Sequence, residues 1–139
     1  MFLELDDSIG MSRFRWKEAL WLPAWGIHCF PTEEQMGNIV LVAEAVGEME
    51  DETGYQFRVT SWLRPKIYNT LVGGSKNSWH MKGGAIDVQP TNPIPCDQIR
   101  SICRPLLSKC GLRMEKRKGS SWVHFDIGHV IGKERYFIP

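Results

Sequence analysis

The sequence lacks an excess of charge of either sign, because 17 lysines and arginines are balanced by 16 aspartates and glutamates, for a net charge of +1. A near-neutral chain offers no broad basic surface, so we expect no nucleic-acid partner. No apolar run approaches the roughly 18–20 residues that cross a bilayer, so we expect no membrane span. The start of the chain is acidic where a secretory signal is basic, so we expect cytoplasmic synthesis without an export signal.

Paired cysteines and the H-E-x-x-H motif are also absent. The four cysteines, Cys29, Cys96, Cys103 and Cys110, form no C-x2-C pair, which argues against a zinc site built from cysteine. Free cysteine packs as a small apolar residue, and a cytosolic protein keeps its thiols reduced. We therefore expect buried, reduced cysteines, although the spacing leaves a disulfide open.

Internal repeats and low-complexity tracts are lacking as well, which is typical of one compact domain. A chain of 139 residues with 42% hydrophobic residues and six tryptophans can bury a single sizeable core. Residues 1–31 are irregular and aromatic, and we expect them to form an arm that packs on a body of residues 32–139. We expect this single domain to be a monomer.

Local patterns predict an α+β fold with a small antiparallel sheet and flanking helices. The clearest element is a helix over residues 32–49, where Thr32 and Gln35 form a capping box and apolar residues follow at three- and four-residue steps. Gly54 is a suitable helix end. Alternation, proline and glycine then predict strands over 56–62 and 85–89, helices over 65–71 and 95–107, the latter bent at Pro105, and hairpin strands over 111–116 and 122–127.

Three residues in the second half of the chain are candidate metal ligands: His80, Asp87 and His124. Catalytic zinc takes three imidazole or carboxylate ligands and keeps a fourth position for water. His80 ends a glycine-rich loop, Asp87 lies seven residues later in a predicted strand, and His124 lies in the last hairpin strand. Spacing alone does not separate these histidines from ordinary core or surface histidines, which is how we interpret His28 and His129.

Five blocks of sequence occur in a fixed order. They are Ser61-Trp62-Leu63-Arg64-Pro65, Tyr68-Asn69, Val72-Gly73-Gly74, Ser78-Trp79-His80-Met81-Lys82-Gly83-Gly84-Ala85-Ile86-Asp87 and Trp122-Val123-His124-Phe125-Asp126. With these blocks in this order, the chain resembles the zinc peptidases of the D-alanyl-D-alanine carboxypeptidase and L-alanyl-D-glutamate endopeptidase family, which cut the stem peptides of peptidoglycan. The family pattern S-x-H-x-x-G-x-A-x-D matches at every fixed position from Ser78 to Asp87. The resemblance covers residues 32–128 and implies the fold of the wider group that includes lysostaphin-type peptidases and the hedgehog domain.

The resemblance implies roles for individual residues. His80, Asp87 and His124 match the three ligands of one zinc ion, Zn2+. Arg64 matches an arginine that binds a substrate carboxylate or stabilises the developing oxyanion, which suits a planar guanidinium; otherwise it is a surface residue of a strand-to-helix loop. Ser78 binds substrate or forms hydrogen bonds within its own loop. Trp122 shares the strand face of His124, so we expect it to line the substrate cleft.

The general base is where the chain departs from better-known members, many of which place an acid or histidine two or three residues before the last ligand. Here those positions hold Ser121 and Trp122. The resemblance favours Glu115 on the neighbouring hairpin strand, because some members, many of them phage-encoded, carry a glutamate upstream. Asp126 shares a strand face with His124, and is the alternative base or an acceptor that holds the imidazole. Glu115 is otherwise a solvated charge of the hairpin.

The predicted function is that of a zinc metallopeptidase acting on peptidoglycan stem peptides, as a D,D-carboxypeptidase or as an L-Ala-D-Glu endopeptidase. A phage-type endolysin, released through a holin or carried in a virion, fits a bare catalytic domain. The alternative is a catalytically inactive module of the same fold that holds zinc for binding or structure. A third interpretation treats the histidines as coincidental and expects the three candidate ligands to lie far apart.

Overall fold

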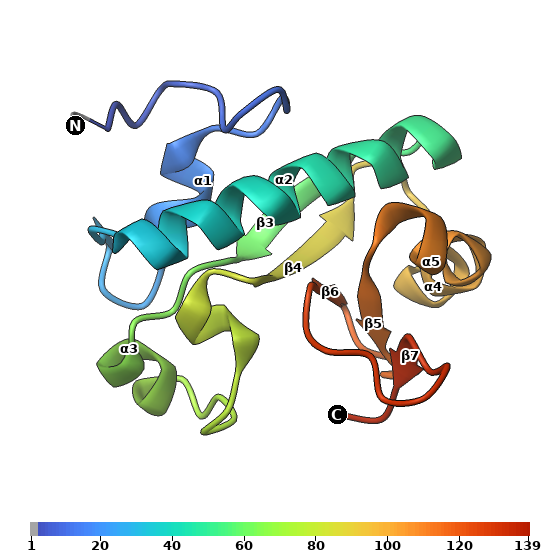
Figure 1. The fold of residues 1–139 in the computed structure, drawn as a ribbon. Helices are drawn as coiled ribbons and strands as arrows, with labels where there is room; N and C mark the ends of the chain where they lie inside the picture. The colour runs from blue at the N-terminus through green and yellow to red at the C-terminus, as the bar shows by residue number, and fades with distance from the viewer. Residues whose placement is uncertain (1–2) are drawn as a thin grey trace.

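The computed structural model describes residues 3–139; Met1 and Phe2, the first residues of the predicted arm, lie outside the described residues. Figure 1 shows a long helix, α2, along one face of a five-stranded sheet with the strand order β3-β4-β6-β5-β7. The fold is therefore of the predicted α+β class. The strands of this sheet are Phe57–Ser61 (β3), Ala85–Pro90 (β4), Arg113–Glu115 (β5), Val123–Asp126 (β6) and Tyr136–Phe137 (β7).

Helix α2 spans Glu33–Thr53 and confirms the predicted helix. The Thr32 hydroxyl accepts a hydrogen bond from the Gln35 backbone N–H, and the Gln35 side chain accepts one from the Thr32 N–H, so the capping box is present. The helix continues four residues beyond residue 49 and ends at Gly54, whose φ of 75° suits glycine. Its apolar face contributes Ile39, Val42, Ala43, Val46 and Met49 to the core.

The central strands have one apolar and one polar face, because successive side chains of a strand alternate. The apolar side chains join the core together with those of α2; they include Ile86, Val88, Met114, Val123 and Phe125. A one-residue slip would turn each apolar side chain to the other face, so burial of this face fixes the register. The polar side chains, which line a common cavity, are Asp87, Gln89, Arg113, Glu115, His124 and Asp126.

The sheet is antiparallel as predicted, with one exception. Strands β3, β4, β6 and β5 pair antiparallel, and β5 and β6 form the predicted hairpin. Strand β7 pairs with β5 in the parallel sense and was not predicted. Its two residues, Tyr136 and Phe137, are too few to produce a recognisable alternation.

The two short helices predicted around the sheet are present. Helix α3 (Lys66–Leu71) follows Pro65, as expected for a proline at a helix start. The helix predicted over residues 95–107 divides into α4 (Cys96–Cys103), the 3-10 turn η2 (Arg104–Leu106) and α5 (Leu107–Cys110). The break falls at Pro105, which has no N–H to continue the α-helical pattern. None of the helices formed by residues 3–139 has the length and apolar character of a bilayer span.

The cysteines of the described chain are all free. Cys103 and Cys110 are buried, whereas Cys29 and Cys96 are partly exposed. The four side chains therefore behave as packing residues in this structure.

The N-terminal segment contains elements that its sequence did not predict. Helix α1 (Trp16–Leu20) leads into a hairpin of β1 (Trp21–Leu22) and β2 (Ile27–His28). Arg13 reaches the end of α2, where its Nη2 lies 2.5 Å from Oε2 of Glu50. The side chains of this segment that enter the common core include Ile9, Phe14, Ala19 and Leu20.

Candidate metal centre

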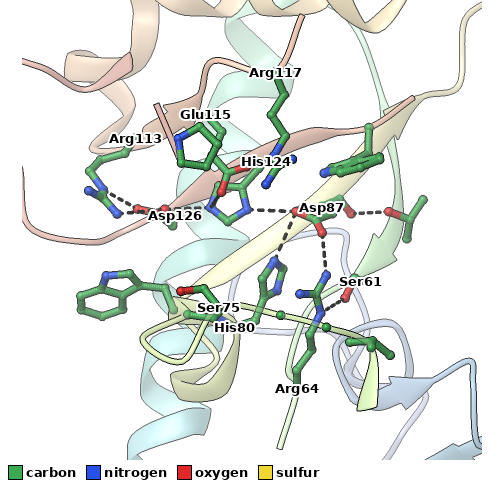
Figure 2. Close-up of a pocket in the computed structure, with 18 of the residues that line it drawn as sticks. Ser61, Arg64, Ser75, His80, Asp87, Arg113, Glu115, Arg117, His124 and Asp126 are labelled. Carbon is green, nitrogen blue, oxygen red and sulfur yellow. Dashed lines mark hydrogen bonds and ion pairs between the residues drawn. The ribbon is translucent and has the colours of Figure 1, made fainter. Parts of the chain in front are cut away.

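A row of side chains crosses the polar face of the sheet. Asp87 of β4 pairs directly with His124 of β6. The β5–β6 register pairs Met114 with Phe125, and continuing it by one residue places Glu115 opposite His124. Directly opposite residues have Cβ atoms about 4.5–5.5 Å apart. Three strands that are separate in the sequence therefore bring two carboxylates to either side of one imidazole, as Figure 2 shows.

His80 approaches this row from the 3-10 helix η1 (Trp79–Lys82). Ser78 is the N-cap of η1, and its Oγ accepts a hydrogen bond from the His80 backbone N–H at 3.1 Å. Gly83 ends the element with a φ of 76°, and a Cβ at this position would lie 2.8 Å from the Gln35 carbonyl oxygen of α2. Only glycine permits this close approach, so the position of His80 depends on the packing of η1 against α2.

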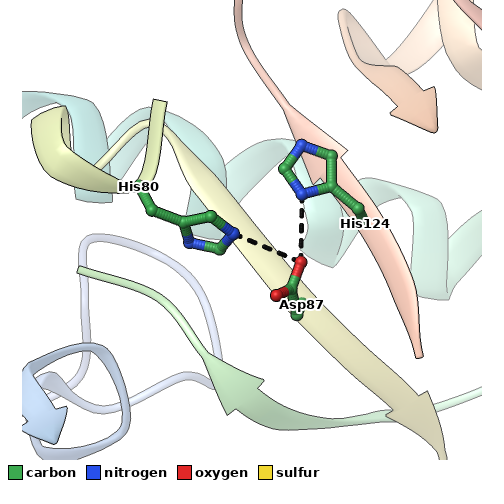
Figure 3. A group of neighbouring side chains, drawn as sticks. All are labelled: His80, Asp87 and His124. Atoms are coloured by element: carbon green, nitrogen blue, oxygen red, sulfur yellow. Dashed lines mark hydrogen bonds and ion pairs between the residues drawn. The ribbon is translucent and has the colours of Figure 1, made fainter. Parts of the chain in front are cut away.

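The three predicted ligands converge, as Figure 3 shows. One potential ligand atom from each of His80, Asp87 and His124 lies within 4.8 Å of the other two, and all three residues are buried. Asp87 Oδ1 lies 3.2 Å from His80 Nε2 and 3.0 Å from His124 Nδ1. The interpretation of coincidental histidines expected these residues to lie far apart, and the structure does not place them so.

The hydrogen bonds of both imidazoles suit metal ligation. His80 Nδ1 lies 2.6 Å from the Trp62 carbonyl oxygen, which can only accept, so this nitrogen carries the proton. His124 Nε2 lies 2.8 Å from Asp126 Oδ2, a carboxylate acceptor. In a neutral imidazole the other nitrogen then has a lone pair, and in both residues that nitrogen faces Asp87. A histidine that donates one N–H to an oxygen acceptor and directs its other nitrogen at a metal is the usual arrangement, so this donor set fits a divalent cation.

The charges at Asp87 and His124 agree with this fit. Burial raises the pKa of Asp87, but the two imidazoles outweigh burial and hold this pKa well below its usual range. Burial lowers the pKa of His124, but its hydrogen bonds with Asp126 and Asp87 outweigh burial and raise this pKa to about 9. Asp87 is therefore a carboxylate at neutral pH, and its surroundings favour a positive charge, either a proton or a metal ion, beside His124.

Arg64 lies against the candidate metal centre. Its Nη2 donates to Asp87 Oδ2 at 2.9 Å, and its Nε donates to Ser61 Oγ at 2.9 Å. Because Arg64 holds Oδ2, the other oxygen of Asp87 is the one that faces the two histidines. Arg64 also lines the cavity, and its Nη1 makes no hydrogen bond within residues 3–139.

Asp126 is enclosed by donors. Arg113 donates from Nε to Oδ1 at 2.6 Å and from Nη2 to Oδ2 at 3.1 Å, and the Gly128 backbone N–H donates to Oδ1 at 2.9 Å. Asp126 is 1% exposed. Burial raises its pKa, but hydrogen bonds with His124 and Arg113 outweigh burial and lower it. The arrangement suits an acceptor that holds the His124 ring better than a base that exchanges protons with a substrate.

Glu115 has fewer partners than Asp126. Its Oε1 lies 3.7 Å from His124 Nε2, and its Oε2 accepts a hydrogen bond from Arg117 Nε at 2.5 Å. The side chain is 14% exposed and lines the cavity. Glu115 is thus a carboxylate that adjoins a candidate ligand and remains accessible from the cavity.

A cavity of about 660 Å³ covers the row of side chains. The glycine-rich loop of residues 72–75, with Ser78, forms one part of its wall, and Trp122 forms another. Ser78 and Trp122, both predicted to contact substrate, therefore line the cavity, and Ser78 also caps η1. A concave site with convergent polar groups and shifted pKa values is typical of a ligand-binding site.

Two contributors to the centre were missed by sequence reasoning. Arg113 holds Asp126, and the hairpin register pairs these two residues, so the predicted hairpin contained the signal. The Trp62 carbonyl holds His80, but a backbone carbonyl has no signal in the sequence. Its role arises only when the chain after β3 packs against η1.

Comparison with known proteins identifies a family and similar solved structures. A family model described as Peptidase M15 matches residues 23–126, about three quarters of the chain. Among solved structures, the chain is similar to the L-Ala D-Glu endopeptidase ChiX of Serratia marcescens, with 20% identity and a TM-score of 0.47 over 70% of this chain and 88% of that chain. No curated protein sequence matches.

Proposed function

The chain belongs to the peptidase M15 family, and we propose that it is a zinc metallopeptidase that hydrolyses peptide bonds in the stem peptides of peptidoglycan. The observation that carries the proposal is the convergence of His80, Asp87 and His124, with the outer nitrogen of each imidazole bonded to an oxygen acceptor. The bond cut is the terminal D-Ala bond of a carboxypeptidase or the L-Ala-D-Glu bond of an endopeptidase.

The proposed ligands suit zinc in kind and in spacing. Atoms around a tetrahedral zinc lie about 3.3 Å from one another, because each is about 2.0–2.1 Å from the metal. The contacts of Asp87 Oδ1 with the two imidazole nitrogens are 3.2 Å and 3.0 Å. When bound, zinc supplies Lewis acidity, which polarises a carbonyl group and makes water more acidic.

Glu115 is proposed as the general base. It lines the cavity beside His124, and its carboxylate accepts the proton of the attacking water and then delivers that proton to the leaving amine. Asp126 holds His124 Nε2–H and keeps the ring directed at Asp87. This assignment uses the more open carboxylate for proton transfer and the enclosed one for orientation.

Arg64 is proposed to act at two places. Its Nη2 holds Asp87 Oδ2 and so orients the carboxylate. Its Nη1 remains for the oxyanion that develops on the substrate carbonyl, because a preorganised cationic donor stabilises such a charge. Ser61 keeps the guanidinium in place through Nε.

An inactive module that only holds zinc is the competing function. That alternative would need a centre without an accessible carboxylate besides Asp87. The position of Glu115, 3.7 Å from His124 Nε2, favours the peptidase.

The test is hydrolysis of purified peptidoglycan and of muropeptides of known stem sequence by the zinc-loaded protein. The variants are His80→Ala, Asp87→Ala and Glu115→Ala, and His28→Ala is the control because His28 packs against Trp21 away from the cavity. We expect the first three to lose hydrolysis and the control to retain it. Mass spectrometry then separates release of D-alanine from release of a stem that begins at D-Glu. Wild-type turnover in all three site variants would refute the proposed function.

A further inference from the structure

Three of the arginines in residues 3–139 line the cavity, and they differ in how firmly they are held. Arg113 donates hydrogen bonds from Nε and Nη2 to the Asp126 carboxylate, and its Nη1 also donates to the His129 carbonyl at 3.3 Å. Arg64 is held by Asp87 and Ser61. The side chain of Arg117 makes a single hydrogen bond within the described residues, from Nε to Glu115 Oε2.

Arg117 lines the cavity, and the outer edge of its guanidinium has no partner among the described residues. Its Nη1 and Nη2 carry four N–H donors, and neither nitrogen makes a hydrogen bond within residues 3–139. The side chain is 43% exposed. Its Cζ lies 5.6 Å from the centre of the Trp122 ring, a cation–π contact that limits where the group can point. Figure 2 shows Arg117 and Arg64 on opposite sides of Asp87.

We propose that Arg117 binds a free carboxylate of the substrate, on the residue that follows the scissile bond. The inference rests on the proposed function and assigns the substrate carboxylate to Arg117 and not to Arg64, whose Nη2 is already held by Asp87. Nη1 and Nη2 form a fork that matches the two oxygens of a carboxylate. Nε meanwhile keeps its bond to Glu115, so one guanidinium aligns the substrate with the base.

The need for a free carboxylate defines the class of substrate. In a terminal D-Ala the residue released by hydrolysis carries the C-terminal carboxylate. D-Glu has two carboxyl groups, of which the peptide chain uses one, so its other carboxylate is free unless it is amidated. Both candidate bonds are therefore followed by a residue that can carry a free carboxylate. A stem peptide with a carboxamide on that residue lacks the group that Arg117 would bind.

The test measures binding separately from turnover. The ligands are stem-peptide analogues, one series for each candidate bond, in which a methylene group replaces the scissile amide nitrogen. Each is made with a free carboxylate and with a carboxamide on the next residue. Calorimetry on the zinc-loaded protein gives the four dissociation constants for the wild type, Arg117→Met, Arg117→Lys and Lys118→Met. Lys118 is exposed on the same turn and lies outside the cavity lining, so Lys118→Met is the matched loss of one charge.

The wild type and Lys118→Met should bind the carboxylate form of at least one series about 10- to 100-fold more tightly than the carboxamide, as for a charged hydrogen-bonded pair. Arg117→Met should bind both forms equally, and Arg117→Lys should fall between, because it keeps the charge without the fork. A carboxylate preference that survives in Arg117→Met overturns the inference, as does its absence in the wild type. Hydrolysis of peptidoglycan by the wild type would still uphold the proposed function in either case, so the two failures are distinguishable.

Discussion

His124 and Asp126 lie on the same face of strand β6, and the 2.8 Å contact between His124 Nε2 and Asp126 Oδ2 directs the opposite nitrogen, Nδ1, at Asp87. Asp126 is in turn held by Nε and Nη2 of Arg113. The orientation of one proposed ligand therefore depends on two residues that do not contact the proposed metal position. Loss of a partner of this kind typically lowers metal affinity by about 10- to 100-fold.

We therefore expect Asp126→Asn to lower zinc affinity by about 10- to 100-fold, because the amide offers one acceptor oxygen where the carboxylate offers two. Competition with a chromogenic chelator measures the affinity. Asp6→Asn is the control, since Asp6 forms an exposed ion pair with Lys17 at 3.0 Å. Unchanged affinity in Asp126→Asn would show that the His124 ring keeps its orientation without this carboxylate.

Glu115→Gln separates proton transfer from metal binding. The variant keeps the shape of the side chain but cannot accept the proton, so kcat on a stem peptide should fall by about 10²- to 10⁴-fold. Zinc affinity should stay close to that of the wild type, because Glu115 is not one of the three converging ligands. The matched control is Glu52→Gln, which removes an ion pair with Lys109 of the same 2.5 Å length. A variant with full kcat would require another base.

The sheet and its polar face could be predicted largely from the sequence. Alternation identified β3, the turn composition of residues 117–121 identified the β5–β6 hairpin, and the capping box identified α2, because these signals depend only on neighbouring residues. The resemblance carried by residues 78–87 and 122–126 named the candidate ligands, and the structure brings them together.

The rest depends on tertiary contacts. Strand β7 pairs with β5 only after the chain returns to the sheet, and Arg64 contacts Asp87 only when the loop after β3 packs beside β4. The hairpin β1–β2 has two residues in each strand, which is too short for periodicity to reveal. The sequence indicated which side chains carry the chemistry, whereas tertiary packing determined which of them contact one another.

Gly83 should tolerate no side chain. Its φ of 76° and the 2.8 Å approach of a Cβ to the Gln35 carbonyl predict that Gly83→Ala lowers the free energy of unfolding by about 1–3 kcal/mol. Because η1 carries His80, zinc affinity should fall as well. Gly37→Ala is the opposite control: Gly37 is exposed in α2 with nothing within 4 Å of a Cβ, so the change should stabilise by about 0.5–1 kcal/mol. Thermal unfolding measures the stability of both variants. If Gly83→Ala is as stable as the wild type, η1 can shift to accommodate the methyl group.

Cys103 should make stability depend on pH in the alkaline range. Burial, with a smaller effect of Cys110, raises the pKa of the Cys103 thiol from 9.0 to about 12. Between these values the unfolded chain has lost a proton that the folded protein keeps, so rising pH favours unfolding. The free energy of unfolding should fall by up to about 1.4 kcal/mol per pH unit from this group. Urea denaturation from pH 8 to pH 10.5 should therefore show a steeper loss in the wild type than in Cys103→Ala, and parallel curves would refute the assignment.

Phe14 connects the N-terminal segment to the candidate metal centre. Its ring is fully buried and packs edge-on against Trp62 at 5.7 Å, and the Trp62 carbonyl holds His80 Nδ1. Phe14→Ala should lower the free energy of unfolding by about 3–5 kcal/mol, because it removes a large core side chain and leaves a cavity. Met11→Ala, at a residue that is 96% exposed, should change it by less than about 0.5 kcal/mol. If both variants unfold at the same urea concentration, the N-terminal segment is not part of the cooperative core, and the support that it gives to His80 through Trp62 would have to be abandoned.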